Sequence, residues 1–143
     1  MTAAVDLYHA VVLEHGKRPR NRGPLPSATH AADGDNPLCG DAMRVELEWR
    51  DARLSAIGFT GESCVLATAS ASLMTERLTG ATKAEAARLV GVVQALCAEG
   101  VDAIGEARPL LGELEAFGDV HRHPVRVGCA TLPWRTLERA LGD

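Results

Sequence analysis

The sequence predicts an α+β fold, in which a helix is followed by a small antiparallel sheet and then by further helices. Ala and Leu supply 40 of the 143 residues whereas Phe, Trp and Tyr supply five, which favours helices over a β-sandwich. Two neighbouring segments have strand periodicity, and those on either side have helical periodicity. The length is typical of one domain, so we expect residues 1–143 to form a single domain.

The first element is predicted to be a helix that Thr2 caps and Gly16 ends. Its expected buried face consists of Ala4, Tyr8, Val11, Val12 and His15. Residues 16–38 are rich in Gly, Pro, Asn and Asp, which predicts a loop with one short strand near 28–32.

A β-hairpin is predicted next. Met43, Val45, Leu47 and Trp49 alternate with charged residues, as in a strand with one buried face. Asp51-Ala52 is a tight connection to a second strand over residues 54–59.

Helices are predicted over most of the remaining chain. One runs from Cys64 to Thr79, and the next opens with a capping box formed by Thr82 and Glu85. Pro109 is expected to start a short helix. The last helix is defined by Trp134, Leu137 and Leu141, so that Cys129 would lie just before it.

Composition excludes several classes of protein. No apolar run approaches the ~20 residues that span a bilayer, and the N-terminal residues lack the pattern of a signal peptide, so a cytoplasmic protein is expected. A net charge of −4 argues against a nucleic-acid-binding protein, and we expect no membrane partner. In that compartment four cysteines favour metal or redox chemistry over disulfides.

Three cysteines are candidates for chemistry. Cys39 lies between Pro37 and Gly40 in an expected exposed turn, and Asp41 could share a metal with it or form an Asx-type hydrogen bond. Cys64 lies at the start of a predicted helix and Cys129 just before one, positions in which a thiolate is stabilised, although a buried thiol is the alternative. No Cys-x-x-Cys pair is present, so any site must be assembled by the tertiary fold.

Other polar groups have simpler interpretations. Cys97 shares a helical face with Ala86, Leu89, Val90 and Val93, which predicts an inert buried thiol. The cluster of Lys17, Arg18, Arg20 and Arg22 is either a solvated loop or a protein-docking patch. His121 and His123 are expected at the surface.

Motifs along nearly the whole chain resemble the SufU branch of the NifU/IscU-like family. They are Leu7-Tyr8, Lys17-x-Pro19-Arg20-Asn21-x-Gly23, Asn36-Pro37-x-Cys39-Gly40-Asp41, Gly61-x-x-Cys64, Ala69-Ser70-Ala71-Ser72-Leu73-Met74 and Cys129-Ala130-Thr131-Leu132-x-Trp134. The segment 105–123 and Gly128, where the IscU branch typically has histidine, resemble SufU more than IscU.

The resemblance implies a three-stranded antiparallel sheet with helices packed on it, and one metal held by Cys39, Asp41, Cys64 and Cys129. Arg126 also matches a family position and is expected near that metal. Zinc is the implied ion, with an iron–sulfur cluster as the alternative, and both accept thiolate ligands.

The function implied by the resemblance is sulfur transfer for iron–sulfur cluster assembly, with a SufS-type cysteine desulfurase and downstream assembly proteins as partners. Cys39 is the expected sulfur acceptor because its turn can move. The chain would then be a sulfurtransferase-like partner of the desulfurase rather than a stand-alone enzyme. A scaffold for cluster assembly and a structural zinc module that binds other proteins are the alternatives.

Overall fold

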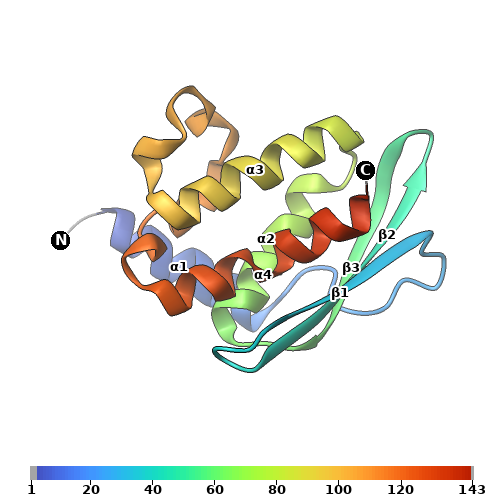
Figure 1. Cartoon of the computed structure of the whole chain (residues 1–143), viewed down its shortest axis with the longest axis horizontal. Helices are drawn as coiled ribbons and strands as arrows, with labels where there is room; N and C mark the ends of the chain where they lie inside the picture. The colour runs from blue at the N-terminus through green and yellow to red at the C-terminus, as the bar shows by residue number, and fades with distance from the viewer. Residues whose placement is uncertain (1–2, 143) are drawn as a thin grey trace.

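Three antiparallel strands and the helices that cover one face of their sheet make up the fold (Figure 1). The computed structural model describes residues 3–142, with side chains from residue 10 onward. The main elements are α1 (Ala3–Lys17), β1 (His30–Asn36), β2 (Asp41–Arg50), β3 (Arg53–Glu62), α2 (Val65–Leu78), α3 (Lys83–Glu99) and α4 (Pro124–Leu141). The predicted α+β class and the three-stranded sheet are confirmed. Among the described helices, none combines the length and the apolar content that a bilayer span requires.

The predicted hairpin is confirmed in its Asp51-Ala52 connection and in its buried face, except that Trp49 is only partly buried, next to a shift in register. Arg50 pairs with Arg53 across a turn in which Asp51 and Ala52 have φ values of 53° and 66°. Two consecutive left-handed residues give the turn the twist that antiparallel strands need. The alternate β2 side chains Met43, Val45 and Leu47 are buried in the core.

The first strand is longer than the prediction and reaches the end of the sheet. β1 begins at His30 and continues to Asn36, which pairs with Asp41 of β2. The prediction ended this strand at residue 32 because Asp, Gly and Asn are depleted in strands. Here α4 packs across β1, and Gly34 lies so close to Thr136 of α4 that any side chain at position 34 would collide with it.

Helix α1 also differs from its prediction, since it passes through Gly16 and ends at Lys17. A Cβ atom at position 16 would lie 2.7 Å from Cγ1 of Val65, so this glycine permits close packing of α1 on α2 rather than ending the helix. Thr2, the expected cap, lies outside the described residues, as do the side chains of Ala4, Leu7 and Tyr8. Val11, Val12 and His15 are buried as expected.

Helices α2 and α3 begin and end close to the predicted positions. Thr82 and Glu85 form the predicted capping box at the start of α3, and Cys97 is buried on its inner face. The segment 101–122 folds into short 3₁₀ turns: η1 (Val101–Ala103), η2 (Gly105–Leu110), η3 (Gly112–Phe117) and η4 (Val120–Arg122). Pro109 lies inside η2, so the prediction that it starts a helix is wrong.

The start of helix α4 differs from the prediction, and this difference matters most for the site. It begins at Pro124 rather than after Cys129, which places Cys129 in its second turn. Gly128 and Pro133 are poor helix formers and hid this helix in the sequence. Its position between the sheet and α2 explains why it forms, because packing of a buried face outweighs intrinsic propensity.

Candidate metal centre

The candidate site lies at the end of the sheet where the β1–β2 turn meets α2 and α4 (Figure 1). Cys39 lies in that turn and is exposed. The backbone amides of Cys39 and Gly40 donate to the carbonyl of Asn36, at 3.2 and 2.9 Å. Gly40 has a φ of 76°, a conformation that glycine adopts without strain. The turn therefore presents the thiol at the surface on a short, tightly folded segment.

Asp41, the first residue of β2, links the turn to the start of α2. Its Oδ1 atom accepts from the backbone amide of Cys64 at 2.9 Å, and its Oδ2 atom lies 3.0 Å from the sulfur of Cys39. Burial raises the pKa of Asp41, but hydrogen bonds from Cys39 and from the Cys64 backbone outweigh it and hold the pKa below its usual value. Asp41 is thus a buried, ionised carboxylate beside a thiol.

Cys129 reaches the same point from α4. Its sulfur lies 3.3 Å from that of Cys39 and 3.8 Å from the side-chain nitrogen of Asn36, and the residue is 5% exposed. Burial raises the pKa of Cys129, and the neighbouring thiols of Cys39 and Cys64 raise it further. A bound cation reverses this effect, because it stabilises a coordinating thiolate.

Cys64 lies at the border of the cluster. It is the N-cap of α2, and its sulfur accepts from the backbone amide of Ala67 at 3.4 Å. Ligand atoms of Cys39, Asp41 and Cys129 all lie within 4.8 Å of one another, a group that does not include the Cys64 sulfur. The structure thus brings three of the four expected ligands together and places the fourth beside them.

The chemistry of these donors fits a tetrahedral metal. Zinc binds thiolate at about 2.3 Å and carboxylate at about 2.0–2.2 Å, which separates its ligand atoms by roughly 3–4 Å. The separations of 3.0 and 3.3 Å are at the short end of that range. Three thiols and one carboxylate also suit iron, since thiolates are the usual ligands of iron–sulfur clusters.

Two other residues considered from the sequence, Cys97 and Arg126, are not among the clustered ligands. Burial raises the pKa of the Cys97 thiol to about 12, and this thiol is not part of the cluster. Arg126, in the first turn of α4, is exposed, and its side chain has no hydrogen bond or ion pair with the side chains described, those of residues 10–142.

Two residues that shape the site, Asn36 and Gly128, were not among the ligands expected from the sequence. Asn36 accepts the turn amides and donates toward the sulfur of Cys129, and a Cβ atom at position 128 would lie 2.7 Å from its side-chain nitrogen. Gly128 therefore lets α4 approach Asn36. The position of Asn36 directly before Pro37, at the start of the Cys39 motif, was the one feature of the sequence that could have indicated its role.

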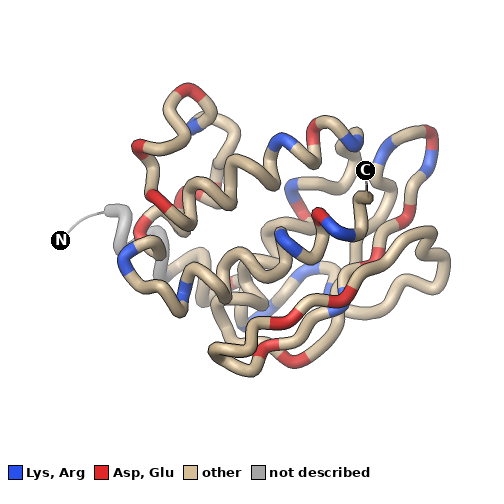
Figure 2. Tube along the Cα trace, viewed as in Figure 1, with Lys and Arg blue, Asp and Glu red and all other residues tan. Residues whose placement is uncertain are grey.

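The basic cluster is partly neutralised in the folded chain. Arg18 and Arg20 form ion pairs with Glu14, and Arg22 donates to the carbonyl of Gly61. Figure 2 shows that acidic and basic residues are interspersed along the chain.

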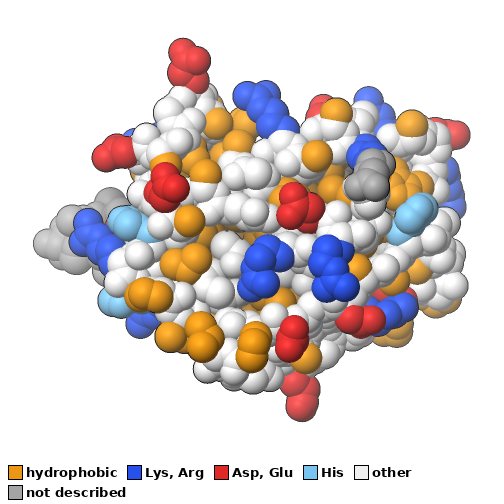
Figure 3. Space-filling model, viewed as in Figure 1, with side chains coloured by type: hydrophobic (Ala, Val, Ile, Leu, Met, Phe, Trp, Pro, Cys, Tyr) orange, Lys and Arg blue, Asp and Glu red, His pale blue; other side chains and the backbone are white. Residues whose placement is uncertain are grey.

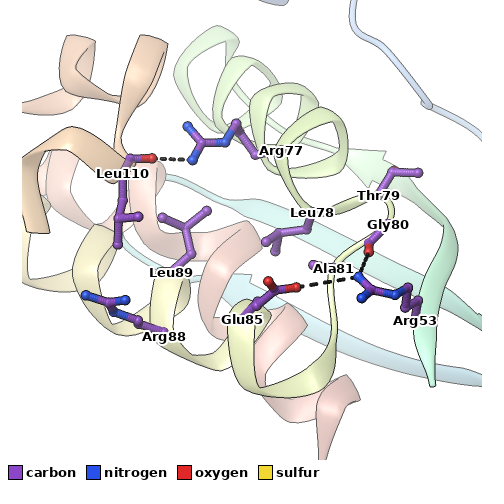
Figure 4. Close-up of a pocket in the computed structure, with 10 residues that line it drawn as sticks. All are labelled: Arg53, Arg77, Leu78, Thr79, Gly80, Ala81, Glu85, Arg88, Leu89 and Leu110. Atoms are coloured by element: carbon purple, nitrogen blue, oxygen red, sulfur yellow. Dashed lines mark hydrogen bonds and ion pairs between the residues drawn. The ribbon is translucent and has the colours of Figure 1, made fainter.

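A pocket of ≈ 470 Å³ lies between the end of α2 and the start of α3 (Figure 4). Arg53 at its edge donates to the carbonyl of Gly80, and Arg77 donates to the carbonyls of Leu110 and Leu111. No cysteine lines this pocket, so it is separate from the candidate metal centre.

The chain is similar to curated proteins of iron–sulfur cluster assembly. The chain is 35% identical over 135 residues to the iron–sulfur cluster assembly scaffold protein IscU of Streptococcus pyogenes serotype M1, covering 94% of this chain and 82% of that protein. It is 34% identical over 137 residues to the zinc-dependent sulfurtransferase SufU of Bacillus subtilis (strain 168), covering 94% and 89%.

The fold of the chain is also similar to that of a solved structure, and most of the chain matches a known family. The crystal structure of FiSufU from Fervidobacterium islandicum AW-1 superposes with a TM-score of 0.85 at 28% identity, covering 95% of this chain and 97% of that chain. Residues 7–143 match the description of the NifU-like N terminal domain. The chain therefore belongs to the NifU-like N-terminal domain family.

Proposed function

We propose that the chain is a zinc-dependent sulfur acceptor that takes persulfide sulfur from a cysteine desulfurase for iron–sulfur cluster assembly. The observation that carries this proposal is the exposed Cys39 thiol, held beside the Asp41 carboxylate and the Cys129 thiol at a turn. The Bacillus subtilis relative, whose name describes a zinc-dependent sulfurtransferase, supports the same assignment.

The residues that would hold zinc are Cys39, Asp41, Cys64 and Cys129. When bound, zinc would keep their thiols deprotonated at neutral pH, which sulfur transfer requires because the thiolate is the nucleophile. Cys64 completes the set through its position at the N-terminus of α2, where free backbone amides and the helix dipole also favour a thiolate.

The transfer step belongs to Cys39. Its thiolate attacks the outer sulfur of the persulfide on the desulfurase cysteine, a new S–S bond forms on Cys39, and the desulfurase cysteine leaves as a thiolate. Asp41 lies within hydrogen-bonding distance of Cys39 and accepts a hydrogen bond from that thiol when it is protonated. The buried Cys129 is less accessible to a partner, so it serves as a ligand rather than as the acceptor.

An apolar rim, formed by Leu38, Val65 and Val125, supports docking of another protein at this site. These side chains are 75%, 56% and 51% exposed, and each lies within four residues of a site cysteine. Figure 3 shows hydrophobic side chains gathered over the beginning of α4 and the adjacent turn, at the lower left. A desulfurase that delivers sulfur to Cys39 must cover this rim.

A scaffold function is the second candidate. The Streptococcus pyogenes relative is named a cluster assembly scaffold, and three cysteines with one aspartate can hold a cluster. Anaerobic purification followed by elemental analysis separates the two functions. We expect about one zinc per chain and no visible absorption, whereas iron together with sulfide would establish the scaffold instead.

The direct test is alanine formation by a purified SufS-type cysteine desulfurase. We expect the chain to stimulate turnover and Cys39→Ser to abolish the stimulation. Cys97→Ala is the control, because Cys97 is buried in the core and is not part of the cluster. Stimulation by Cys39→Ser at the wild-type rate would exclude Cys39 as the acceptor. No effect of the wild-type chain on turnover would leave a structural zinc module as its function.

A further inference from the structure

A second group of potential ligands lies apart from the cysteines. His15 of α1, Glu76 of α2 and Glu113 of η3 have ligand atoms that all lie within 4.8 Å of one another. The Nε2 atom of His15 is 3.7 Å from Glu76 and 4.0 Å from Glu113. Three elements far apart in the sequence thus aim one imidazole nitrogen and two carboxylates at a common point.

The imidazole is held as a ligand would be. His15 is 3% exposed, and its Nδ1 atom lies 2.7 Å from the hydroxyl of Ser72. That hydroxyl also accepts from the backbone amide of Arg20 at 2.8 Å, which fixes its position. No hydrogen bond from another described residue reaches Nε2, which faces the two carboxylates. Histidines that bind metals are oriented in this way through their other ring nitrogen.

The charges around His15 also suit a cation. Burial lowers the pKa of His15 below its usual value, and the positive charge of Arg20 lowers it further. The ring is therefore neutral at pH 7, as a metal ligand must be. Glu76 has its other oxygen 3.7 Å from Arg20, and Arg20 also pairs with Glu14. Glu14 also pairs with Arg18, so Glu14, Glu76 and Glu113 together face two guanidinium groups, and one net negative charge is left for a metal ion to neutralise.

We propose that His15, Glu76 and Glu113 form a second metal site, which takes a divalent first-row transition ion such as Zn²⁺ or Co²⁺. One imidazole and two carboxylates are suitable donors for these ions, and three protein ligands leave positions for water. The side chains of Glu76 and Glu113 are 44% and 60% exposed, so they can close the last few tenths of an ångström and admit the ion from solvent.

Occupation of this site has a structural consequence. Glu113 belongs to the 3₁₀ segment 101–122, whereas His15 and Glu76 belong to the helices on which that segment lies. A bound ion would therefore tie the segment to α1 and α2, away from the cysteine centre. The proposed site is independent of sulfur transfer. The number of metal ions bound can therefore be measured whether or not the chain stimulates a desulfurase.

The test is a Co²⁺ titration of the full chain after it has been loaded with one equivalent of Zn²⁺. Equilibrium dialysis with elemental analysis counts both metals, and visible absorption detects any Co²⁺ that enters a thiolate site. We expect one equivalent of Co²⁺ to bind with Zn²⁺ retained and with no thiolate charge-transfer band. Retention of one metal in total, or Co²⁺ bound only with displacement of Zn²⁺, would overturn the proposal.

Two matched variants test whether the bound Co²⁺ lies at this cluster. Glu113→Gln removes one ligand with little change in shape, and it should weaken Co²⁺ binding at least about tenfold. Glu106→Gln makes the same charge change on the same segment outside the cluster, and it should bind Co²⁺ like the wild type. Equal Co²⁺ affinity in Glu113→Gln and the wild type would contradict the assignment, as would equal loss in both variants.

Discussion

At the scale of single residues, environment rather than residue type determines what each cysteine can do. Cys39 and Cys97 have the same side chain, but Cys39 is exposed beside a carboxylate whereas Cys97 is surrounded by the apolar core. Helical spacing was enough to predict the core position of Cys97. The pairing of Cys39 with Asp41 was foreseeable because only one residue separates them.

We predict that Cys97→Ala lowers the free energy of unfolding by about 1 kcal/mol at neutral pH and leaves bound metal unchanged. The difference between wild type and variant should shrink as pH rises above 9. The unfolded thiol ionises near 9.0, whereas burial keeps the folded thiol protonated up to about 12, so the wild type loses stability across that interval. Denaturant unfolding of both proteins at several pH values measures this difference. Loss of metal from Cys97→Ala would contradict the core assignment.

Asp41 is predicted to contribute through its charge. Asp41→Asn retains an oxygen that can accept from the Cys64 amide, but it removes the ionised group beside Cys39. Zinc affinity, measured by chelator competition, should fall by at least about tenfold, because a neutral amide is a weaker ligand. Unchanged affinity would remove Asp41 from the ligand set.

At the scale of elements, the prediction succeeded where local signals were strong and failed where packing dominates. The hairpin and the capped helix α3 have period-two and capping patterns that do not depend on neighbours. The end of β1 and the start of α4 contain Asp, Gly and Pro, which locally disfavour those structures. Both segments adopt them because α4 packs against β1, a contact that a sequence does not display.

The close approach of α4 to the β1–β2 turn can be tested with one substitution. Gly128→Ala places a Cβ atom 2.7 Å from the Asn36 side chain, and it should lower stability and weaken metal binding by displacing Cys129. Gly91→Ala in α3 is the control, because a Cβ atom there meets nothing within 4 Å, and it should stabilise the chain by about 0.5–1 kcal/mol. Thermal unfolding and chelator competition report both effects. If both substitutions stabilise the chain, the position of α4 does not require the close contact between residue 128 and Asn36.

At the scale of the whole molecule, the candidate centre exists only after the fold has formed. Its residues come from a turn, a strand, a helix cap and the second turn of another helix. Spacing alone did not predict that these residues meet, and the expectation rested on family resemblance. His15, Glu76 and Glu113 belong to no local motif, so only the structure shows that they are neighbours.

The basic cluster is a property of the surface as a whole. Lys17, Arg18 and Arg22 are its exposed members. Reversal of the charges of Lys17 and Arg18 to Glu should weaken desulfurase binding and make it less sensitive to salt. Metal content should not change. Arg50→Glu with Arg88→Glu is the charge-matched control, since both residues are exposed and lie away from the cluster. Titration of stimulation at low and high ionic strength provides the measurement, and equal salt dependence in all three proteins would leave the cluster as a solvated loop.

The central claim is that Cys39 receives sulfur at this site. The most direct measurement is peptide mass spectrometry of the chain after anaerobic incubation with a cysteine desulfurase and cysteine, followed by alkylation. We predict that the peptide containing Cys39 gains the mass of one sulfur atom, while those containing Cys64, Cys97 and Cys129 do not. A persulfide on Cys64 or Cys129 with Cys39 unmodified, or no persulfide on any cysteine of a chain that stimulates the desulfurase, would contradict the account.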